Sequence, residues 1–403
     1  MEKPAPPSRL ARFTDALGLR RSMVALLVMV VLVGLGERLG ERFLPIYLLA
    51  LGAGIHLPGV LNAMDNLLSA LYSFPGGYLA DRLGTKRALL VFNGIALLGY
   101  AIVVIFPTWW AVFVGSMFFL SWSAISLPAS MSLVADALPR DRRTMGVSMH
   151  SLMRRLPMAL GPIIGGILID RFGTIPGIRL AFALAMALGL LSIVFQQMLI
   201  EDDIGLRSKS AEIDPRRVLR DMSPSLRVLL VADILVRFAE QIPYAYVVIW
   251  CIHNVGISGV EFGVLTTVEM VTAALIYLPV AYLADRSTKK PFVVTTFAFF
   301  TLFPLVLLFS DSFVLLVVAF VIRGLKEFGE PTRKALIMDL APEGQKAGMF
   351  GAYYLARDVA VSVVALGSGF LWQISPAANL LTAAACGLAG TLLFAWRGRS
   401  LTA

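Results

Sequence analysis

The sequence predicts an all-α integral membrane protein of twelve transmembrane helices, arranged as two pseudo-symmetric bundles of six. Of its 403 residues, 58% are hydrophobic and only 15% are charged, whereas soluble domains carry about 25% charged residues. Many apolar runs are also long enough, at about 20 residues, to cross a bilayer as a helix. These spans are expected at residues 22–50, 58–80, 88–106, 109–138, 144–170, 178–200, 226–254, 259–283, 290–309, 312–338, 345–373 and 376–396.

An internal repeat divides the chain into two related halves. Tyr78-Leu79-Ala80-Asp81-Arg82 returns as Tyr282-Leu283-Ala284-Asp285-Arg286, and Pro75 and Pro279 precede the two copies at the same distance. Duplicated halves of apolar helices are typical of transporters, whose substrate path lies between the repeats. We therefore expect an N-terminal bundle at residues 1–200, a linker at residues 201–225 and a C-terminal bundle at residues 226–403.

The positions of the basic residues predict the topology. The net charge is +9, but the arginines and lysines gather in alternate loops, as the positive-inside rule requires. Only Arg171 and Arg179 lie on the opposite side. This pattern predicts a multi-pass protein of the cell inner (cytoplasmic) membrane, with both termini and the linker in the cytoplasm, and it gives no reason to expect a nucleic-acid partner.

The loop after the second predicted span carries a motif. Residues 77–87 read Gly-Tyr-Leu-Ala-Asp-Arg-Leu-Gly-Thr-Lys-Arg, which resembles the G-x-L-a-D-R-x-G-r-K-r loop of the major facilitator superfamily. The resemblance implies that superfamily's fold, alternating-access transport and a cytoplasmic gate closed by pairing of opposite charges; for the basic residues, a role in topology alone is the alternative. The expected gate residues are Gly77, Asp81, Arg82, Gly84, Lys86 and Arg87, with Asp285 and Arg286 in the degenerate second copy.

The fifth span resembles one branch of this superfamily. Gly161, Pro162, Gly165 and Gly166 match the core of the G-x-x-x-G-P-x-x-G-G signature of its drug and metabolite antiporters, although Pro157 replaces the upstream glycine. A purely structural reading is that the small residues let this helix pack closely against a neighbour. The fourth span also departs from the antiporter pattern, because Met117 to Ser130 contains no arginine.

The first span resembles a different branch. Glu37-Arg38-Leu39-Gly40-Glu41-Arg42-Phe43 is similar to the E-x-x-E-R-F element of proton-coupled oligopeptide transporters, with the first glutamate one residue too far away. That shift of about 100° moves Glu37 to another face of the helix relative to Arg42. The resemblance suggests uptake of an anionic or zwitterionic solute.

Ionisable side chains within the spans are the main candidates for a site, because each costs a few kcal/mol in lipid unless it meets a cavity or a partner. A proton-coupled carrier needs a buried carboxylate close to a basic group, and Glu37 or Glu41 beside Arg38 and Arg42 fits. A permanent ion-pair network is the alternative, above all for Arg38 with Glu41 and for Arg237 with Glu240. The candidates for proton coupling and the substrate cavity are Glu37, Arg38, Glu41, Arg42, Asp65, Arg237, Glu240, Glu269, Arg323, Lys326, Glu327 and Arg357.

Asp65 and Glu269 occupy equivalent positions in the two repeats, and we expect either a gating or a proton-binding role for them. Aromatic residues such as Tyr244 could stack on an organic substrate or belong to the interfacial belt. The sequence shows no metal-ligand spacing, ATP-binding motif or hydrolytic triad, so no enzyme activity and no cofactor are expected.

Taken together, these patterns predict a secondary active transporter of a small organic solute, coupled to protons and biased towards export by drug or metabolite:proton antiport. Proton-coupled uptake of a peptide or organic acid is the alternative, favoured by the excess of basic residues in the spans. A sensor or uncoupled lipid transporter on the same fold is a third possibility, against which the many intramembrane carboxylates argue. We expect a monomer in the bilayer, with protons and the solute as its partners.

Overall fold

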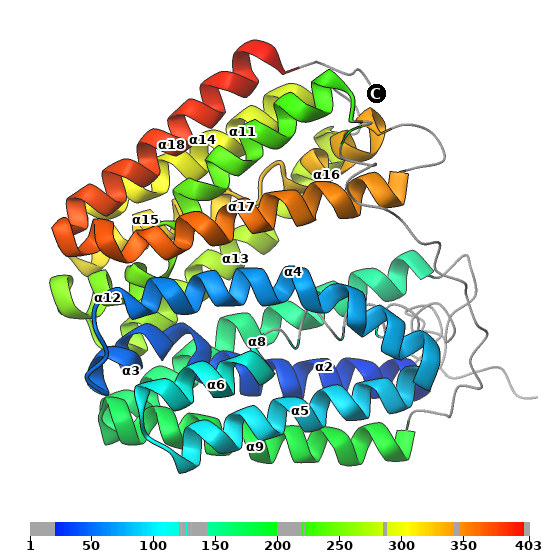
Figure 1. Ribbon diagram of the computed structural model, residues 1–403, viewed down its shortest axis with the longest axis vertical. Coiled ribbons are helices and arrows are strands. Elements are labelled where there is room, and N and C mark those ends of the chain that lie inside the picture. Colours follow the sequence, from blue (N-terminus) through cyan, green and yellow to red (C-terminus); the bar gives the residue numbers. More distant parts are fainter. Residues whose placement is uncertain are drawn as a thin grey trace, which may run out of the picture.

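The structure, a computed structural model, describes residues 21–120, 143–199, 222–284, 288–341 and 346–398 and the single positions 122, 126, 130 and 220. All regular structure in these parts is helical, in two bundles that lie side by side (Figure 1). The first bundle holds α2 (Arg21–Gly40), η1 (Glu41–Phe43), α3 (Leu44–Ala50), α4 (Leu57–Leu83), α5 (Thr85–Ile105), α6 (Trp109–Phe119), α8 (Arg143–Phe172) and α9 (Thr174–Leu199). The second holds α11 (Pro224–Gln241), η3 (Tyr244–Tyr246), α12 (Val247–Ile249), η4 (Trp250–Val255), α13 (Gly259–Ala284), α14 (Lys289–Leu308), α15 (Phe313–Leu325), α16 (Glu330–Leu340), α17 (Lys346–Ile374) and α18 (Pro376–Arg397).

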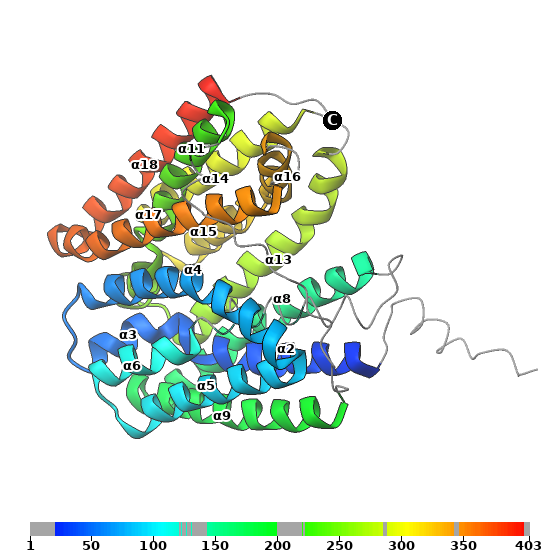
Figure 2. The same cartoon turned by 45° about the vertical axis from the view of Figure 1, so that its right-hand side comes forward.

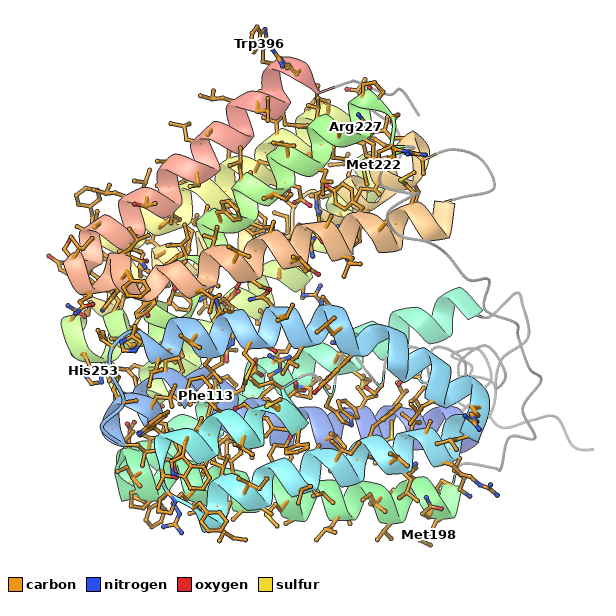
Figure 3. All side chains as sticks on the ribbon, in the orientation of Figure 1. Phe113, Met198, Met222, Arg227, His253 and Trp396 are labelled. Atoms are coloured by element: carbon orange, nitrogen blue, oxygen red, sulfur yellow. The ribbon has the colours of Figure 1, made fainter. Side chains whose placement is uncertain are left out.

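Six of the described helices are long and apolar enough to cross a membrane, namely α5, α9, α13, α14, α17 and α18. Large apolar side chains such as Leu190 and Val363 are exposed, and exposed Trp396 points outwards from α18 (Figure 3), as expected of surfaces that face lipid. The chain is therefore a multi-pass membrane protein. The remaining helices carry several charges, are interrupted, or adjoin positions outside the described residues, so the number twelve stays a prediction.

Three of the predicted spans are broken within the membrane rather than continuous. Span 22–50 becomes α2, a 3-10 turn at η1 and α3, with Pro45 in the first turn of α3. Span 226–254 breaks after α11, where Pro243 precedes the 3-10 turn η3, and span 312–338 breaks between α15 and α16, where Pro331 opens α16. Proline lacks an amide hydrogen and ends the regular hydrogen-bond pattern. Non-helical backbone at membrane depth is tolerated where it is buried in protein or lines a cavity.

The two bundles meet mainly through α8 with α13 and α4 with α17. We call the end of the molecule that carries residues 51–58 and 250–258 the closed end, because contacts between the bundles gather there. Tyr246 donates to the carbonyl of Ile55 (3.0 Å), and His56 stacks on Phe370 with ring centroids 6.4 Å apart. Towards the opposite end, the linker end, α4 and α17 diverge (Figures 1 and 2).

Glycines permit the close approach of α8 and α13. A Cβ added at Gly166 would lie 2.2 Å from the carbonyl oxygen of Gly259, and one added at Gly263 would lie 2.6 Å from the backbone of Ile163. On the other faces of α8, a Cβ at Gly161 or Gly165 would collide with the backbone of α2. The glycines identified by the antiporter-like motif thus lie at helix contacts, both within the first bundle and between the bundles.

Candidate functional site

A pocket lies between the two bundles, lined by residues of both. Its polar lining comes from η1 (Glu41 and Arg42), α4 (Asn62 and Asp65), η3 (Tyr244) and α15 (Arg323). Two of these elements, η1 and η3, lie at helix breaks in the two repeats, so the interruptions place polar side chains at the pocket.

Two of the pocket charges have an ionic partner. Glu41 pairs with Arg38, one turn earlier in α2, at 2.6 Å. Arg323 pairs with Glu269 of α13 at 3.3 Å, and both side chains are almost fully buried. These pairs neutralise one carboxylate on the first bundle and one guanidinium on the second.

The other two pocket charges, Arg42 and Asp65, have no ion pair among the described residues. The guanidinium of Arg42 lies over the Tyr244 ring, 5.3 Å from its centroid, and that of Arg323 lies 5.8 Å from the same centroid. In the part of the chain that the structure describes, neither Arg42 nor Asp65 has an ion pair or a side-chain hydrogen bond. The pocket therefore presents one available positive charge and one available negative charge.

Amide side chains join the bundles next to Asp65. Asn62 donates to the backbone carbonyl and to the side-chain oxygen of Gln241, at 3.1 and 3.2 Å. Asn66 donates to the same side-chain oxygen at 3.2 Å. These bonds tie α4 to the end of α11, where Glu240 begins the charge network of the second bundle.

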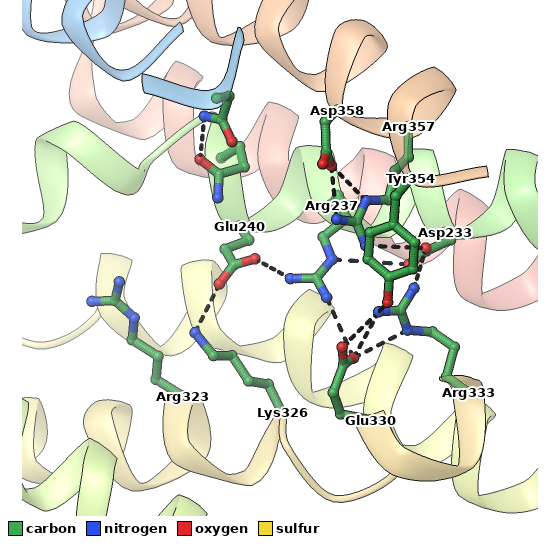
Figure 4. Close-up of polar contacts among 12 residues, drawn as sticks. Asp233, Arg237, Glu240, Arg323, Lys326, Glu330, Arg333, Tyr354, Arg357 and Asp358 are labelled. Carbon is green, nitrogen blue, oxygen red and sulfur yellow. Dashed lines mark hydrogen bonds and ion pairs between the residues drawn. The ribbon is translucent and has the colours of Figure 1, made fainter. Parts of the chain in front are cut away.

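That network starts close to the pocket (Figure 4). Lys326 contacts Glu269 at 3.2 Å and Glu240 at 2.7 Å. Arg237 contacts Glu240 at 2.7 Å and Glu330 at 3.3 Å. Carboxylates and cations thus alternate across α11, α13 and the α15–α16 region, and the predicted pair of Arg237 with Glu240 is present.

The network continues to α16 and α17, where it includes the predicted candidate Arg357 together with Asp233 and Arg333, which the sequence had not indicated. Arg333, only 1% exposed, contacts Asp233 and also Glu330 (2.7 Å). Asp233 further accepts a hydrogen bond from Tyr353 (3.0 Å) and lies 3.7 Å from Arg357. The spacings of Asp233 with Arg237 (i, i+4) and of Glu330 with Arg333 (i, i+3) were the available signal.

The three other candidates are Glu37, Glu327 and Arg357. Glu37 is buried, at 2% exposure. Glu327 has no ion pair in the described part of the chain and lies next to Lys326 at the α15–α16 break. Arg357 pairs with Asp358 at 2.7 Å and lies over the ring of Tyr354 at 4.1 Å. The structure therefore gathers Glu41, Arg42, Asp65 and Arg323 at the pocket and the remaining C-terminal candidates mainly in the network.

The predicted gate lies at the linker end and is described in part. Gly77, Asp81 and Arg82 belong to the last turns of α4, Gly84 has a positive φ of 81° between α4 and α5, and Lys86 and Arg87 open α5. Glycine is the residue best suited to such a φ. Asp285 and Arg286 lie outside the described residues, as does the side chain of Asp81.

The arrangement of two bundles around a central pocket can be compared with known proteins. The family model described as Major Facilitator Superfamily matches residues 26–230 and 229–402, which together cover nearly the whole chain. The chain belongs to the Major Facilitator Superfamily. It is consequently a secondary transporter and not an enzyme.

Curated relatives within the superfamily are distant. The uncharacterized MFS-type transporter MJ1560 of Methanocaldococcus jannaschii is 25% identical over 83% of this chain and 87% of its own. The multidrug resistance protein MdtG of Escherichia fergusonii is 25% identical over 74% of both chains. The class E tetracycline resistance protein of Escherichia coli is 25% identical over 54% of both chains.

Solved structures of the superfamily support the fold. A mutant of the nucleoside transporter NupG superimposes with a TM-score of 0.78 at 12% identity, covering 94% of this chain and all of its own. A mutant of the peptide transporter POT superimposes with a TM-score of 0.76 at 17% identity, covering 92% of both chains. At these identities the similarity shows the two-bundle fold alone, so the chemistry of the pocket has to indicate the substrate.

Proposed function

We propose that this transporter exports a small organic solute across the cell inner membrane in exchange for protons. Two of the relatives carry the names multidrug resistance protein and tetracycline resistance protein, and Gly166 of the antiporter-like motif lies at the contact between the bundles. By the positive-inside rule, the linker end faces the cytoplasm. The closed end then faces outwards, and the pocket alternates between the two sides as the bundles rock.

The proposed coupling of solute transport to protons rests on one observation, the position of the Asp65 carboxylate in the pocket. A carboxylate that exchanges protons for solute must be reachable from the pocket and must not be permanently neutralised by a cation. Asp65 lines the pocket and has no ion pair within the described residues. The charged groups acting on it are Glu37, Arg38, Glu41 and Arg42.

The paired carboxylates fit this role less well, and Glu37 and Glu327 are not among the residues that line the pocket. Glu240 and Glu269 each contact Lys326, and Glu330 contacts two arginines, so protonating any of them would leave a buried cation without its partner. Glu41 is held by Arg38. We therefore assign proton binding to Asp65 and a structural role to the paired carboxylates. A single chain carries both bundles and the pocket, so we propose a monomer as the working unit.

Uptake of an anionic or zwitterionic solute is the second candidate, and Arg42 favours it. This guanidinium lines the pocket without an ion pair in the described part of the chain, and structures of the peptide transporter POT are among the structural neighbours. Both candidates use the same pocket and differ in the direction of the proton relative to the solute.

Proton movement in proteoliposomes containing the full-length protein tests the proposal. A pH-sensitive dye inside the vesicles reports proton flux when tetracycline, other cationic drugs, organic anions, peptides or lysolipids are added outside. Antiport predicts that at least one compound drives protons in the direction opposite to itself, and that Asp65→Asn abolishes this flux.

The matched control is Asp311→Asn, because Asp311 is exposed and lies away from the pocket. This variant is expected to behave like the wild type. Proton movement in the same direction as the solute would support uptake instead. Proton exchange that persists in Asp65→Asn would refute the assignment of Asp65.

A further inference from the structure

The pocket contains an uncompensated pair of opposite charges. Arg38 neutralises Glu41 at 2.6 Å and Glu269 neutralises Arg323 at 3.3 Å. Arg42 and Asp65 line the same pocket, and in the described part of the chain neither has an ionic partner. The ionic groups left for a ligand are therefore one guanidinium and one carboxylate.

A ligand is bound best when it compensates both groups. Charges removed from water cost several kcal/mol unless they are paired and hydrogen-bonded. A cationic solute that fills the pocket can pair with Asp65 but desolvates Arg42 without compensation. An anionic solute can pair with Arg42 but desolvates Asp65 without compensation. A solute that carries both charges pairs with both residues.

We propose that the solute is amphoteric: a small organic molecule with an anionic group that binds Arg42 and a basic nitrogen that binds Asp65. This inference rests on the proposed function, since it assigns the ligand class of the same pocket. It narrows the drugs and metabolites considered above to those that carry both kinds of group, such as amino acid derivatives or drugs with a carboxylate and an amine.

The environment of Arg42 suits an anion such as a carboxylate. The Tyr244 ring lies against the guanidinium, 5.3 Å away, and it supports the planar group through a cation–π contact. Arg42 makes no side-chain hydrogen bond within the described residues, so its five N–H donors are available for bidentate hydrogen bonds to a carboxylate. Tyr244 thus positions Arg42 without neutralising it.

The apolar lining of the pocket indicates the chemical character of the rest of the ligand. Apolar side chains of both bundles also line the pocket, among them Leu61, Leu120, Val247, Val248 and Phe262. The predicted ligand therefore has an apolar body with charged groups at two separate points.

Two scaffolds, each in three ionic forms, test this inference. Norfloxacin carries both charges, its ethyl ester keeps only the ammonium group, and its N-acetyl derivative keeps only the carboxylate. The dipeptide Phe-Ala, its methyl ester and its N-acetyl derivative form the second set. Binding to the purified full-length protein is measured by isothermal titration calorimetry. In at least one scaffold, we expect the amphoteric form to bind at least tenfold more tightly than either singly charged form.

Single substitutions then test the contact of the anionic group with Arg42 and the contact of the basic nitrogen with Asp65 one at a time. Arg42→Gln is expected to weaken the amphoteric form at least tenfold and to leave the ester unaffected, while Asp65→Asn should weaken the amphoteric form and leave the N-acetyl form unaffected. Arg42→Lys keeps the charge and should retain part of the affinity, which shows that the pocket remains folded. Arg171→Gln and Asp311→Asn, at exposed positions, are the matched controls and should bind like the wild type.

The inference is overturned if an ester binds as tightly as its amphoteric parent in both scaffolds, if Arg42→Gln binds like the wild type, or if neither amphoteric compound binds. The proton assay distinguishes this failure from failure of the proposed function. Esters that exchange with protons through Asp65 while Arg42→Gln has no effect would refute the inference alone. Tight amphoteric binding without any proton movement would refute the coupling alone.

Discussion

Removing the carboxylate of Asp170 should open the closed end. This side chain, at the end of α8 in the first bundle, caps the first turn of α13 in the second. Its two oxygens accept hydrogen bonds from the amides of Gly259 (2.8 Å) and Val260 (2.9 Å). A negative charge at a helix N-terminus also interacts favourably with the helix dipole. The contact bridges the bundles and has to break whenever the closed end opens.

The size of the effect follows from these two bonds. A hydrogen bond to a charged group contributes about 1.5–3 kcal/mol. Because Asp170 is exposed, we take a value near the low end of this range for its two hydrogen bonds together. A loss of about 1.4 kcal/mol in Asp170→Ala corresponds to about a tenfold shift of the conformational equilibrium towards the state with the closed end open.

Double electron–electron resonance measures that shift. Spin labels at Phe172→Cys and Ile374→Cys report the separation of the bundles at the closed end, in a background where Cys251 and Cys386 are replaced. Both labelled positions are strongly exposed, at 54% and 76%, so the labels disturb little. Asp170→Ala should enlarge the long-distance population about tenfold and Asp311→Ala should not change it. Identical distance distributions in the wild type and in Asp170→Ala would refute the role given to this cap.

Three further predictions concern other contacts. Gly166→Ala places a Cβ 2.2 Å from the carbonyl oxygen of Gly259, so it should also raise the long-distance population in the same resonance experiment, whereas Gly351→Ala, which meets nothing within 4 Å, should not. Asp233→Asn removes one of the two carboxylates that contact buried Arg333 and leaves Glu330 paired with it, so the loss should be smaller than the about 3–5 kcal/mol of a fully broken buried pair and the thermal unfolding temperature should fall; a temperature equal to that of exposed Asp311→Asn would contradict this. Asp81→Asn should reduce transport more than Asp285→Asn, because only the first copy of the motif is complete; equal transport rates in the vesicle assay would remove that distinction.

The sequence predicted the two-bundle fold because its signals are local and repeated. Apolar runs and basic loops follow directly from the bilayer, and the repeat Tyr78–Arg82 marks the two halves independently of any contact. The interruptions at η1 and η3 were harder to see, because Pro45 and Pro243 are tolerated within a helix whenever a neighbour satisfies the freed backbone groups. Only the packed structure shows where such neighbours exist.

The candidate site was predictable in kind but not in detail. Short-range pairs such as Arg38 with Glu41 follow from helical spacing, and the structure contains them. Long-range pairs do not follow from spacing: Arg333 meets Asp233, 100 positions earlier in the chain. For the same reason sequence alone could not separate Asp65, which has no ionic partner in the described part of the chain, from its repeat counterpart Glu269, which has two.

The charge network of the second bundle also constrains how the chain enters the membrane. The segment from Arg323 to Arg333 carries basic and acidic groups that are each unfavourable by about 2.5–3.5 kcal/mol at the centre of an isolated transmembrane helix. Its partners Asp233, Arg237, Glu240 and Glu269 lie earlier in the chain and are synthesised first. Stable insertion of this segment therefore depends on α11 and α13 staying beside the insertion machinery until it emerges, so that biogenesis of the second half is a cooperative step rather than a helix-by-helix one.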